Sequence, residues 1–396
     1  MNMNEQMKES EESILHTYNR FPVVFEKGQG CYLYDSEGKE YLDFAAGIAV
    51  NSLGYHYPGY DEALKDQIDK LMHISNLYYN EPIIEAGAKL VKASKMSKAF
   101  FTNSGTEAIE GALKAAKKYA YVRDGHADHE IIAMNHSFHG RSIGALSVTG
   151  TAHYREPFEP LMGGVKFADF NDLESVKAQI TDKTCAIITE VVQGEGGIYP
   201  AKKEFLEGLR QICDEKDIML IFDEIQCGMG RTGHYFAWQA YGVQPDIMTS
   251  AKALGCGVPV GAFVLNEKAA KASLEPGDHG TTYGGNPFVC AAVSKVFDIY
   301  ENDKIIEHVQ EMTPYLEQKL DEIVAKHECA VTRRGMGFMQ GIVIQGRSVG
   351  EVVKAALAKG LLVISAGSDV LRIVPPLVIT KEHIDKMAAI LDECME

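Results

Sequence analysis

Short apolar runs alternate with amphipathic stretches through the middle of the chain, and this alternation restricts the folds that the chain can adopt. From about Lys98 onward, stretches with helical spacing of apolar residues, such as Ile109–Tyr119 and Lys203–Lys216, separate the apolar runs. Strands that alternate with helices form a mostly parallel sheet with helices on both faces. We therefore predict an α/β fold for this region. Its expected strands are Ala99–Thr102, Glu130–Met134, Cys185–Glu190, Met219–Asp223, Asp246–Ser250 and Gly261–Leu265.

The two ends of the chain show other patterns. Gly30–Gly38 and Lys39–Phe44 alternate around an Asp-Ser-Glu-Gly turn, which predicts a β-hairpin. After Asn286, helical runs lead into short strand-like segments and a closing helix, as is typical of an α+β unit. These segments are Val289–Asn302, Lys304–Lys326, Gly341–Ile344, Leu362–Ser365, Leu371–Ile373 and Lys381–Cys394.

The chain has 396 residues, which exceeds the size at which one hydrophobic core usually stops growing, so two domains are expected. We predict a large α/β domain over residues 59–288. The second is a small α+β domain in which the N-terminal segment, residues 1–58, meets the C-terminal segment, residues 289–396.

Charge and composition exclude several classes of partner. The net charge is −16, whereas a nucleic-acid-binding surface needs clustered positive charge. No apolar run reaches the roughly 18 residues that span a membrane. Met1–Ser13 is polar and acidic, unlike a secretory signal or a transit peptide. We expect no nucleic acid, no membrane and a cytoplasmic location.

The eight cysteines are scattered, without a C-x-x-C or a short cluster of His and Cys ligands. This spacing supports neither a zinc site nor a disulfide framework. We expect free thiols and no bound metal.

Two predicted strands lead to a carboxylate and an amine. Met219–Asp223 ends on Asp223, and Asp246–Ser250 is followed by Lys252 and a glycine-rich turn. Ligands bind at the carboxyl ends of the strands in an open α/β sheet. A pyridoxal phosphate enzyme needs this pair, because the amine forms a Schiff base and the carboxylate keeps the pyridine nitrogen protonated. Taken singly, a carboxylate after a strand is more often a helix cap or a surface turn than a cofactor ligand, and a lone lysine after a short strand points to a cofactor even less.

Thr102–Glu107 lies between a predicted strand and an amphipathic helix. The free N–H groups and the dipole at a helix N-terminus bind phosphate, Gly105 permits close approach of the backbone, and Thr106 adds a hydroxyl. Ser104 and Glu107 also fit a capping box, which needs no ligand. A nucleotide-binding α/β protein is a further alternative, although the chain has neither G-x-G-x-x-G after its first strand nor G-x-x-x-x-G-K-[ST].

Three further loops follow strands or precede helices. Phe138 can stack on a flat ring, and Arg141 can bind a carboxylate through its fork of N–H donors. Glu195 stands in a glycine-dense loop, and Thr281 and Thr282 offer hydroxyls before a helix. A core aromatic, a surface ion pair and plain turns are the structural alternatives for these residues.

The order of these loops resembles the class III, or ω-amino, aminotransferases of fold type I over roughly residues 18–396. The resemblance implies a large domain with a mostly parallel sheet between helices, and a small α+β domain formed by both chain ends. It also implies pyridoxal 5′-phosphate as the cofactor. The motifs that carry it are S-G-T-E, F-H-G-R, E-x-x-Q-G-E-G-G, F-D-E-x-Q-x-G-x-G-R-T-G, S-x-A-K, T-Y-G-G-N-P and L-R-x-x-P-P-L.

The resemblance implies roles for the cofactor-binding residues. Lys252 would be the Schiff-base lysine and proton shuttle, and Asp223 the partner of the pyridine nitrogen. Gln226 would hydrogen-bond the ring hydroxyl, and Phe138 would stack on the ring. In an obligate homodimer with shared active sites, the phosphate would be held by Gly105, Thr106 and, from the neighbouring subunit, Thr282.

The resemblance also implies how small amino acid and 2-oxo acid substrates bind. Arg141 would bind a substrate carboxylate, and Thr281 would belong to the substrate site. Arg372, paired with Glu195, would be a second carboxylate site that opens when glutamate or 2-oxoglutarate is present. Glu195 would thereby take part in catalysis.

Within the class, Gly47–Gly54, Ser75–Leu77 with Asn80–Pro82, and Phe138–Gly150 are most similar to acetylornithine aminotransferases. The resemblance therefore implies transfer of the δ-amino group of N2-acetylornithine to 2-oxoglutarate in arginine biosynthesis. Ornithine δ-aminotransferases typically carry tryptophan at the position of His139. Ornithine, succinylornithine, succinyl-diaminopimelate and 4-aminobutyrate stay alternative donors. A glutamate-1-semialdehyde aminomutase shares the fold and the lysine, but it fits the pairing of Glu195 poorly.

Overall fold

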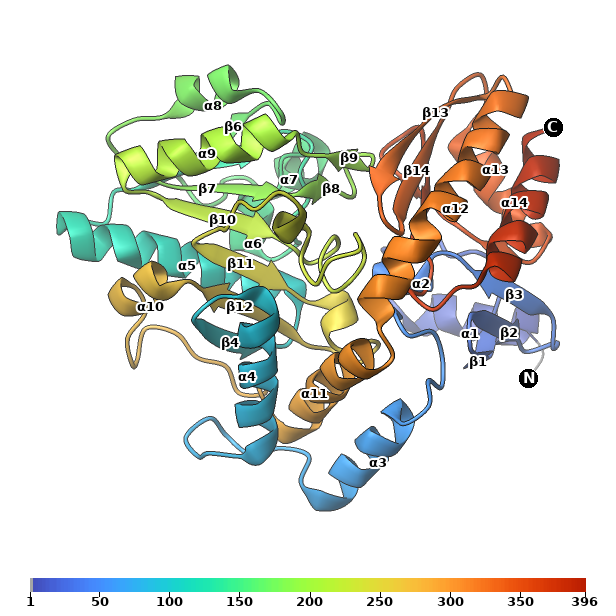
Figure 1. Cartoon of the computed structure of the whole chain (residues 1–396), viewed down its shortest axis with the longest axis horizontal. Coiled ribbons are helices and arrows are strands. Elements are labelled where there is room, and N and C mark those ends of the chain that lie inside the picture. Colours follow the sequence, from blue (N-terminus) through green and yellow to red (C-terminus); the bar gives the residue numbers. More distant parts are fainter. Residues whose placement is uncertain (1–2) are drawn as a thin grey trace.

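The computed structural model describes residues 3–396, and its largest element is a seven-stranded sheet (Figure 1). Neighbouring strands are parallel except at β12, which runs antiparallel to β11 and β4. In sheet order the strands are β4 (Lys98–Thr102), β12 (Gly261–Leu265), β11 (Ile247–Ser250), β10 (Met219–Asp223), β7 (Thr184–Glu190), β5 (Glu130–Met134) and β6 (Val165–Ala168). The predicted mostly parallel sheet is confirmed, and β6 at its edge is the strand that the sequence pattern missed.

Helices cover both faces of this sheet because alternate strand residues enter different hydrophobic cores. Met219 and Ile221 of β10 pack with α5 (Gly105–Asp124), whereas Leu220 packs with α9 (Lys203–Lys216). Side chains alternate between the two faces of a strand, so a strand that is buried on both faces reads as a continuous apolar run. The layered α/β domain expected from that pattern is therefore present.

The N-terminal strands, blue in Figure 1, lie beside the orange and red C-terminal elements. β1 (Phe25–Gln29), β2 (Tyr32–Asp35) and β3 (Glu40–Asp43) are antiparallel neighbours, which confirms the predicted hairpin. β15 (Leu361–Leu362) joins β3 in parallel. The two chain ends thus share one sheet, while the exact domain boundaries at residues 58 and 288 stay predictions.

A second small sheet consists of C-terminal residues alone. Its strands, in sheet order, are β13 (Ala330–Met336), β14 (Met339–Ile344), β17 (Val370–Ile373) and β16 (Ile364–Ala366). The helices that pack with this sheet or with one another are α12 (Ile305–Lys326), α13 (Val349–Ala358) and α14 (Lys381–Met395). The single strand predicted over Leu362–Ser365 is wrong. The chain leaves one small sheet and enters the other at Val363, between β15 and β16. Each of these strands has only two or three residues, so the apolar pattern of the sequence shows no boundary between them.

Helix α11 (Pro287–Asn302) packs against α3 (Tyr60–Lys70) and α4 (Glu81–Ser94). Asn286 caps it, because its side-chain oxygen accepts from the Val289 N–H at 3.0 Å. The remaining elements are α1 (Met3–Ser13), α2 (Ala46–Ala49), α6 (Ile143–Ser147), α7 (Ala152–Arg155), α8 (Leu173–Gln179), α10 (Glu267–Ala272), β8 (Val192–Gln193), β9 (Tyr199–Pro200) and the 3-10 turns at 156–158, 237–240 and 252–254.

Among the helices described between residues 3 and 396, none is long and apolar enough to cross a membrane. All eight cysteines carry free thiols, as the sequence predicts, and all but Cys329 are buried.

Gly111 lies on the buried face of α5, where a methyl group would overlap the ring of Phe263 on β12. We expect Gly111→Ala to lower the free energy of unfolding, because forced repacking of a core costs about 1–3 kcal/mol. The better helix propensity of alanine, about 1 kcal/mol, offsets only part of this cost. The urea midpoint should therefore fall. Gly163→Ala is the matched control, because a methyl group there would have no atom within 4 Å. An unchanged midpoint for Gly111→Ala would show that α5 shifts away from β12 without cost.

Candidate active site

A cavity of about 510 Å³ lies at the carboxyl edge of the large sheet. The strands β7, β10 and β11 end beside it, so residues that are distant in the chain meet there. Among the residues singled out from the sequence, its wall contains Gly105, Thr106, Phe138, Arg141, Asp223, Gln226 and Lys252.

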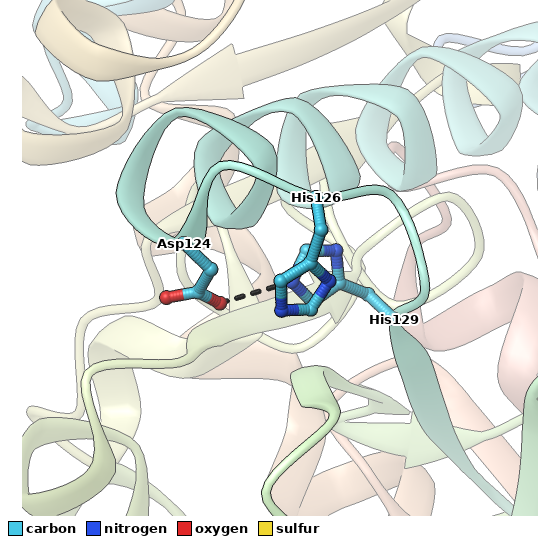
Figure 2. A group of neighbouring side chains, drawn as sticks. All are labelled: Asp124, His126 and His129. Atoms are coloured by element: carbon cyan, nitrogen blue, oxygen red, sulfur yellow. Dashed lines mark hydrogen bonds and ion pairs between the residues drawn. The ribbon is translucent and has the colours of Figure 1, made fainter.

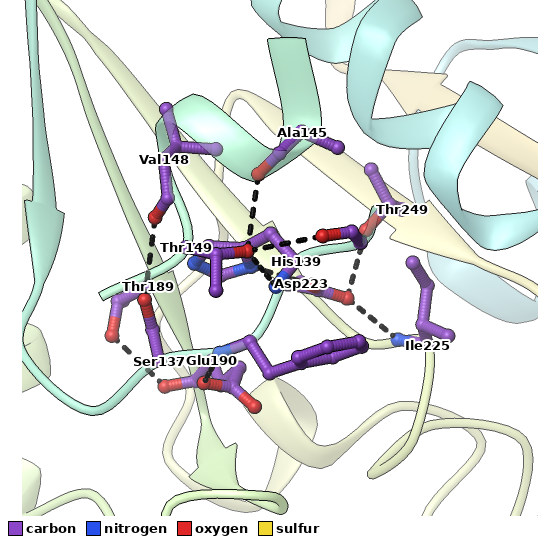
Figure 3. A network of polar contacts seen from close by, with 12 residues as sticks. Ser137, His139, Ala145, Val148, Thr149, Thr189, Glu190, Asp223, Ile225 and Thr249 are labelled. Carbon is purple, nitrogen blue, oxygen red and sulfur yellow. Dashed lines mark hydrogen bonds and ion pairs between the residues drawn. The ribbon is translucent and has the colours of Figure 1, made fainter. Parts of the chain in front are cut away.

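Asp223 is buried at the end of β10, with 3% of its surface exposed, and hydrogen bonds fix its carboxylate (Figure 3). Its Oδ1 accepts from the Ile225 N–H at 3.0 Å and from Thr249 Oγ1 at 3.1 Å. Its Oδ2 lies 2.7 Å from Nδ1 of His139, which is also buried. A buried carboxylate needs such partners, and here they fix the direction in which it points.

His139 comes from the loop after β5, and hydrogen bonds within that loop hold it (Figure 3). Its N–H donates to Thr149 Oγ1 at 3.0 Å, and Thr149 Oγ1 donates in turn to Ala145 O at 3.1 Å. Within residues 3–396, the buried Nε2 of His139 has no hydrogen-bond partner. The contact of His139 with Asp223 was not predicted from the sequence. The one signal for His139 was its place in the F-H-G-R motif.

Glu190 is a buried carboxyl that the sequence analysis did not assign to the site. It ends β7 directly beside Asp223 in the parallel register of β7 and β10. Burial, and then the negative charge of Asp223, raise the pKa of Glu190 well above its usual value. Its oxygens accept from the Gly194 N–H at 3.2 Å and the Phe138 N–H at 3.4 Å. Its position at a strand end, like that of Asp223, is the signal that could have identified it.

Lys252 follows β11 and lines the cavity. Its φ is +48°, in the left-handed region that residues other than glycine rarely adopt. Across residues 3–396, the amine makes neither a hydrogen bond nor an ion pair. Burial, and then the positive charge of Arg372, lower the pKa of Lys252 to about 8. The amine therefore loses its proton far more readily than an exposed lysine, as a nucleophilic amine must.

Helix α5 begins at the cavity wall with Gly105 and Thr106. Ser104 caps it by accepting from the Glu107 N–H at 3.3 Å, and the Glu107 carboxylate accepts from the Asn103 N–H at 2.6 Å. The first N–H groups of a helix have no partner inside the helix, so they stay available to an anion. The helix is thus capped, and its first turn faces the cavity as a phosphate site requires.

Arg141 lines the cavity without an acidic partner among residues 3–396. Its guanidinium carbon lies 4.0 Å from the ring centre of Tyr154 and 5.5 Å from that of Phe138. An arginine that is held only by aromatic rings keeps its N–H donors for an incoming carboxylate.

Arg372, on β17, is paired with Glu195 beside the cavity. Nη1 lies 2.5 Å from Oε1 and Nη2 lies 3.2 Å from Oε2, which makes the pair bidentate. Gln226 of the cavity wall accepts from Arg372 Nη1 at 3.0 Å and so connects the pair to the cavity. Burial opposes ionisation of Glu195, but Arg372 outweighs it and holds the pKa of Glu195 below its usual value.

Thr281 and Thr282 lie outside the cavity wall. Thr281 Oγ1 accepts from Asn103 Nδ2 at 3.1 Å and from the Gly284 N–H at 3.2 Å, which holds this turn next to the start of α5. Thr282 is exposed. A role for Thr282 at a phosphate therefore depends on a second copy of the chain.

A separate cluster of Asp124, His126 and His129 lies at the end of α5 (Figure 2), and none of the three lines the cavity. Its spacing in the sequence did not mark it as a cluster of metal ligands. Its potential ligand atoms lie within 4.8 Å of one another, and His129 Nε2 is 2.9 Å from Asp124 Oδ2. Arg123, however, already donates to both oxygens of Asp124 at 2.6 Å. The carboxylate is thus neutralised by a neighbouring side chain, and the absence of a functional metal stays a prediction.

The lowered pKa of Lys252 gives a measurable pH dependence. In protein freed of any bound cofactor, trace labelling with acetic anhydride, followed by mass spectrometry, should show the Lys252 amine becoming reactive with a midpoint near pH 8, because only the neutral amine reacts. In Arg372→Ala the midpoint should move to higher pH, since the positive charge that favours the neutral amine is gone. Arg333→Ala, which removes an arginine that is paired elsewhere, should leave it unchanged. A wild-type midpoint of about 10.4, the value of an ordinary lysine, would contradict this description.

Known proteins of similar sequence and structure share this arrangement of strands and loops. The acetylornithine aminotransferase of Clostridium acetobutylicum is 47% identical over 388 residues, which cover 98% of this chain and 100% of that protein. The crystal structure of N-acetylornithine aminotransferase from Stenotrophomonas maltophilia superposes with a TM-score of 0.85 at 35% identity, covering 98% of each chain. The ornithine aminotransferase from Toxoplasma gondii superposes with a TM-score of 0.95 at 28% identity, covering 100% of this chain and 95% of that one.

The family model for class-III aminotransferases matches residues 14–395. This range contains every residue described above for the cavity, including the start of α5 and the Glu195–Arg372 pair. The family match therefore covers the whole candidate site. The chain belongs to the class-III aminotransferases, which depend on pyridoxal 5′-phosphate.

Proposed function

We propose that this chain transfers the δ-amino group of N2-acetylornithine to 2-oxoglutarate, a step of arginine biosynthesis. The proposal is carried by a difference in pairing between two arginines. Arg141 lines the cavity without an acidic partner among the described residues, whereas Arg372 is paired with Glu195. Such a site suits a donor whose carboxylate lies far from the reacting amine. The name of the Clostridium acetobutylicum relative supports the choice of donor.

The groups around the cavity fit pyridoxal 5′-phosphate. The fixed carboxylate of Asp223 would face the pyridine nitrogen, and the start of α5 would hold the phosphate through Gly105 and Thr106. Phe138 would lie against the ring. Gln226 would turn its amide toward the ring hydroxyl, because its contact with Glu195 is long, at 3.4 Å. When bound, the protonated pyridine ring supplies the electron sink for chemistry at the carbon that bears the amine.

Lys252 would hold the cofactor covalently through Nζ until a substrate amine displaces it. Nζ would then carry the proton between substrate and cofactor carbons as a general base and acid. Its lowered pKa suits both tasks, because the neutral amine is nucleophilic and accepts a proton near the operating pH. Asp223 would stay in place throughout, since its hydrogen bonds to Thr249 and Ile225 come from the fold and not from the substrate.

The two arginines would orient the two substrates differently. Arg141 would bind the α-carboxylate of the donor and so bring its δ-amine to Lys252. Glu195 would prevent that carboxylate from binding at Arg372, which is specificity by exclusion. When 2-oxoglutarate enters, its α-carboxylate would replace Glu195 on Arg372. One carboxylate replaces another in this exchange, so the buried guanidinium is never left unpaired, a state that would be strongly unfavourable.

The active sites would be shared between two copies of the chain. Leu77 and Tyr79, in the loop before α4, are 87% and 96% exposed. This loop lies against the turn that carries Thr282, because Asn76 Nδ2 donates to Gly284 O at 2.9 Å. Clustered exposed apolar side chains mark interaction surfaces. A second copy that covers this surface would bring Thr282 toward the neighbouring phosphate site.

A panel of donors with 2-oxoglutarate as acceptor tests the substrate. We expect N2-acetylornithine to give the highest kcat/KM, ahead of N2-succinylornithine, ornithine, N-succinyl-diaminopimelate and 4-aminobutyrate. Ornithine is the second candidate, because a close structural neighbour is an ornithine aminotransferase. If ornithine gave the highest kcat/KM, the proposed donor would be wrong, but transamination to 2-oxoglutarate would stand. Conversion of glutamate-1-semialdehyde without 2-oxoglutarate would contradict the reaction itself.

Glu195→Gln tests the exclusion of the donor from Arg372. The glutamate half-reaction should be retained or improved, because no ion pair has to be broken before glutamate binds. The acetylornithine half-reaction should slow by roughly tenfold or more, as expected if a competing site costs about 1.4 kcal/mol. Single-turnover absorbance with each donor alone measures the two separately.

The matched control is Glu317→Gln, which removes the charge from a glutamate paired with Arg333 at 3.1 Å away from the cavity. It should change neither half-reaction. Equal losses of both half-reactions in Glu195→Gln would show that Glu195 only supports its loop.

A further inference from the structure

Arg141 lines the cavity, and within residues 3–396 its guanidinium makes no hydrogen bond or ion pair but lies over two aromatic rings. We propose that Tyr154 is the residue that positions Arg141 for the substrate carboxylate. This inference rests on the carboxylate-binding role proposed for Arg141 and adds a positioning residue to it. Tyr154 is not part of the cavity wall, so it would act through Arg141 and not through direct contact with substrate.

Tyr154 lies on α7, and its ring contacts both Arg141 and Phe138 of the F-H-G-R loop. Its ring centre is 4.0 Å from the guanidinium carbon of Arg141. Its ring also meets that of Phe138 edge to face, with centres 5.9 Å apart and planes inclined at 78°. Phe138 lies farther from the guanidinium, at 5.5 Å. Tyr154 is thus the nearer of the two rings and the one that connects them.

An aromatic face has an advantage over an acidic side chain for holding this arginine. A carboxylate would occupy the N–H donors and neutralise the charge, as Glu195 does at Arg372. A ring attracts the cation through its face and leaves the N–H fork free for a bidentate carboxylate. It also restricts a long, exposed side chain that would otherwise lose rotamer freedom on binding substrate.

The ring of Tyr154, and not its hydroxyl, carries this role. Across residues 3–396, the Tyr154 hydroxyl makes no hydrogen bond. Tyr154→Phe keeps the ring and should therefore leave the KM for N2-acetylornithine within about twofold of wild type. Tyr154→Leu removes the ring and should raise that KM roughly three- to thirtyfold, the range that cation–π energies imply. Its kcat should change little, because the carboxylate is bound alike before and during the reaction.

A double-mutant cycle separates positioning from a general effect on the fold. In an Arg141→Ala background, Tyr154→Leu should have almost no further effect on KM, since there is no guanidinium left to position. The matched control is Phe167→Leu, because the neighbouring residue Arg155 stacks over Phe167 at 4.0 Å without touching Arg141. Phe167→Leu should leave the KM unchanged. Absorbance of bound pyridoxal phosphate confirms that each variant is assembled.

The outcomes distinguish the inference from the function on which it rests. If Arg141→Ala leaves the KM for N2-acetylornithine unchanged, the carboxylate role of Arg141 is wrong. If Arg141→Ala raises the KM but Tyr154→Leu does not, that role stands and the positioning role of Tyr154 is overturned. Equal rises in KM for Tyr154→Phe and Tyr154→Leu, or additive effects in the cycle, would also overturn it, because they would indicate a hydroxyl contact or an effect on folding.

Discussion

The proposed active site depends on holding the amine of Lys252 in the protein interior without a fixed carboxylate partner. Asp223 and Glu195 are among the negative charges that act on it, and each is already engaged by other groups. Asp223 is hydrogen-bonded by Thr249, and Glu195 is paired with Arg372. If either carboxylate turned to Lys252, the ion pair would favour the protonated amine. Burial and the positive charge of Arg372 therefore lower the pKa of the amine, and the hydrogen bonds of Asp223 and Glu195 limit how far these carboxylates raise it again.

The large sheet makes this arrangement rigid. β7, β10 and β11 are adjacent, so Glu190 and Asp223 end in register and Lys252 follows one strand further along. Both faces of these strands are packed by helices, so a ligand can reach them at an end and not across a face, and the cavity lies at their carboxyl ends. The polar groups meet where the apolar packing stops, and this is why one edge of the sheet carries the chemistry.

The sequence predicts best the features that arise from local pattern. Asp223 and Lys252 were recognisable because each follows an apolar run that is buried on both faces. The contact of His139 with Asp223 depends on the path of a loop between two strands, which no spacing in the sequence encodes. The raised pKa of Glu190 depends on its burial and on the strand register that places it beside Asp223. The change of sheet at Val363 could not be predicted, because the two flanking strands are too short to show an alternation of apolar and polar residues.

The loop after β10 supports the strand that carries Arg372 of the Glu195–Arg372 pair. Arg231 of this loop is fully buried and donates to Pro375 O, while the Phe338 N–H donates to Arg231 O at 2.8 Å. These bonds tie the loop to the chain segments that flank β14 and β17, and so anchor the strand that carries Arg372. The side chain of Arg372 is 4% exposed, whereas that of Glu195 is 26% exposed. In the proposed exchange of carboxylates at this pair, Glu195 would therefore leave while the guanidinium stays in place.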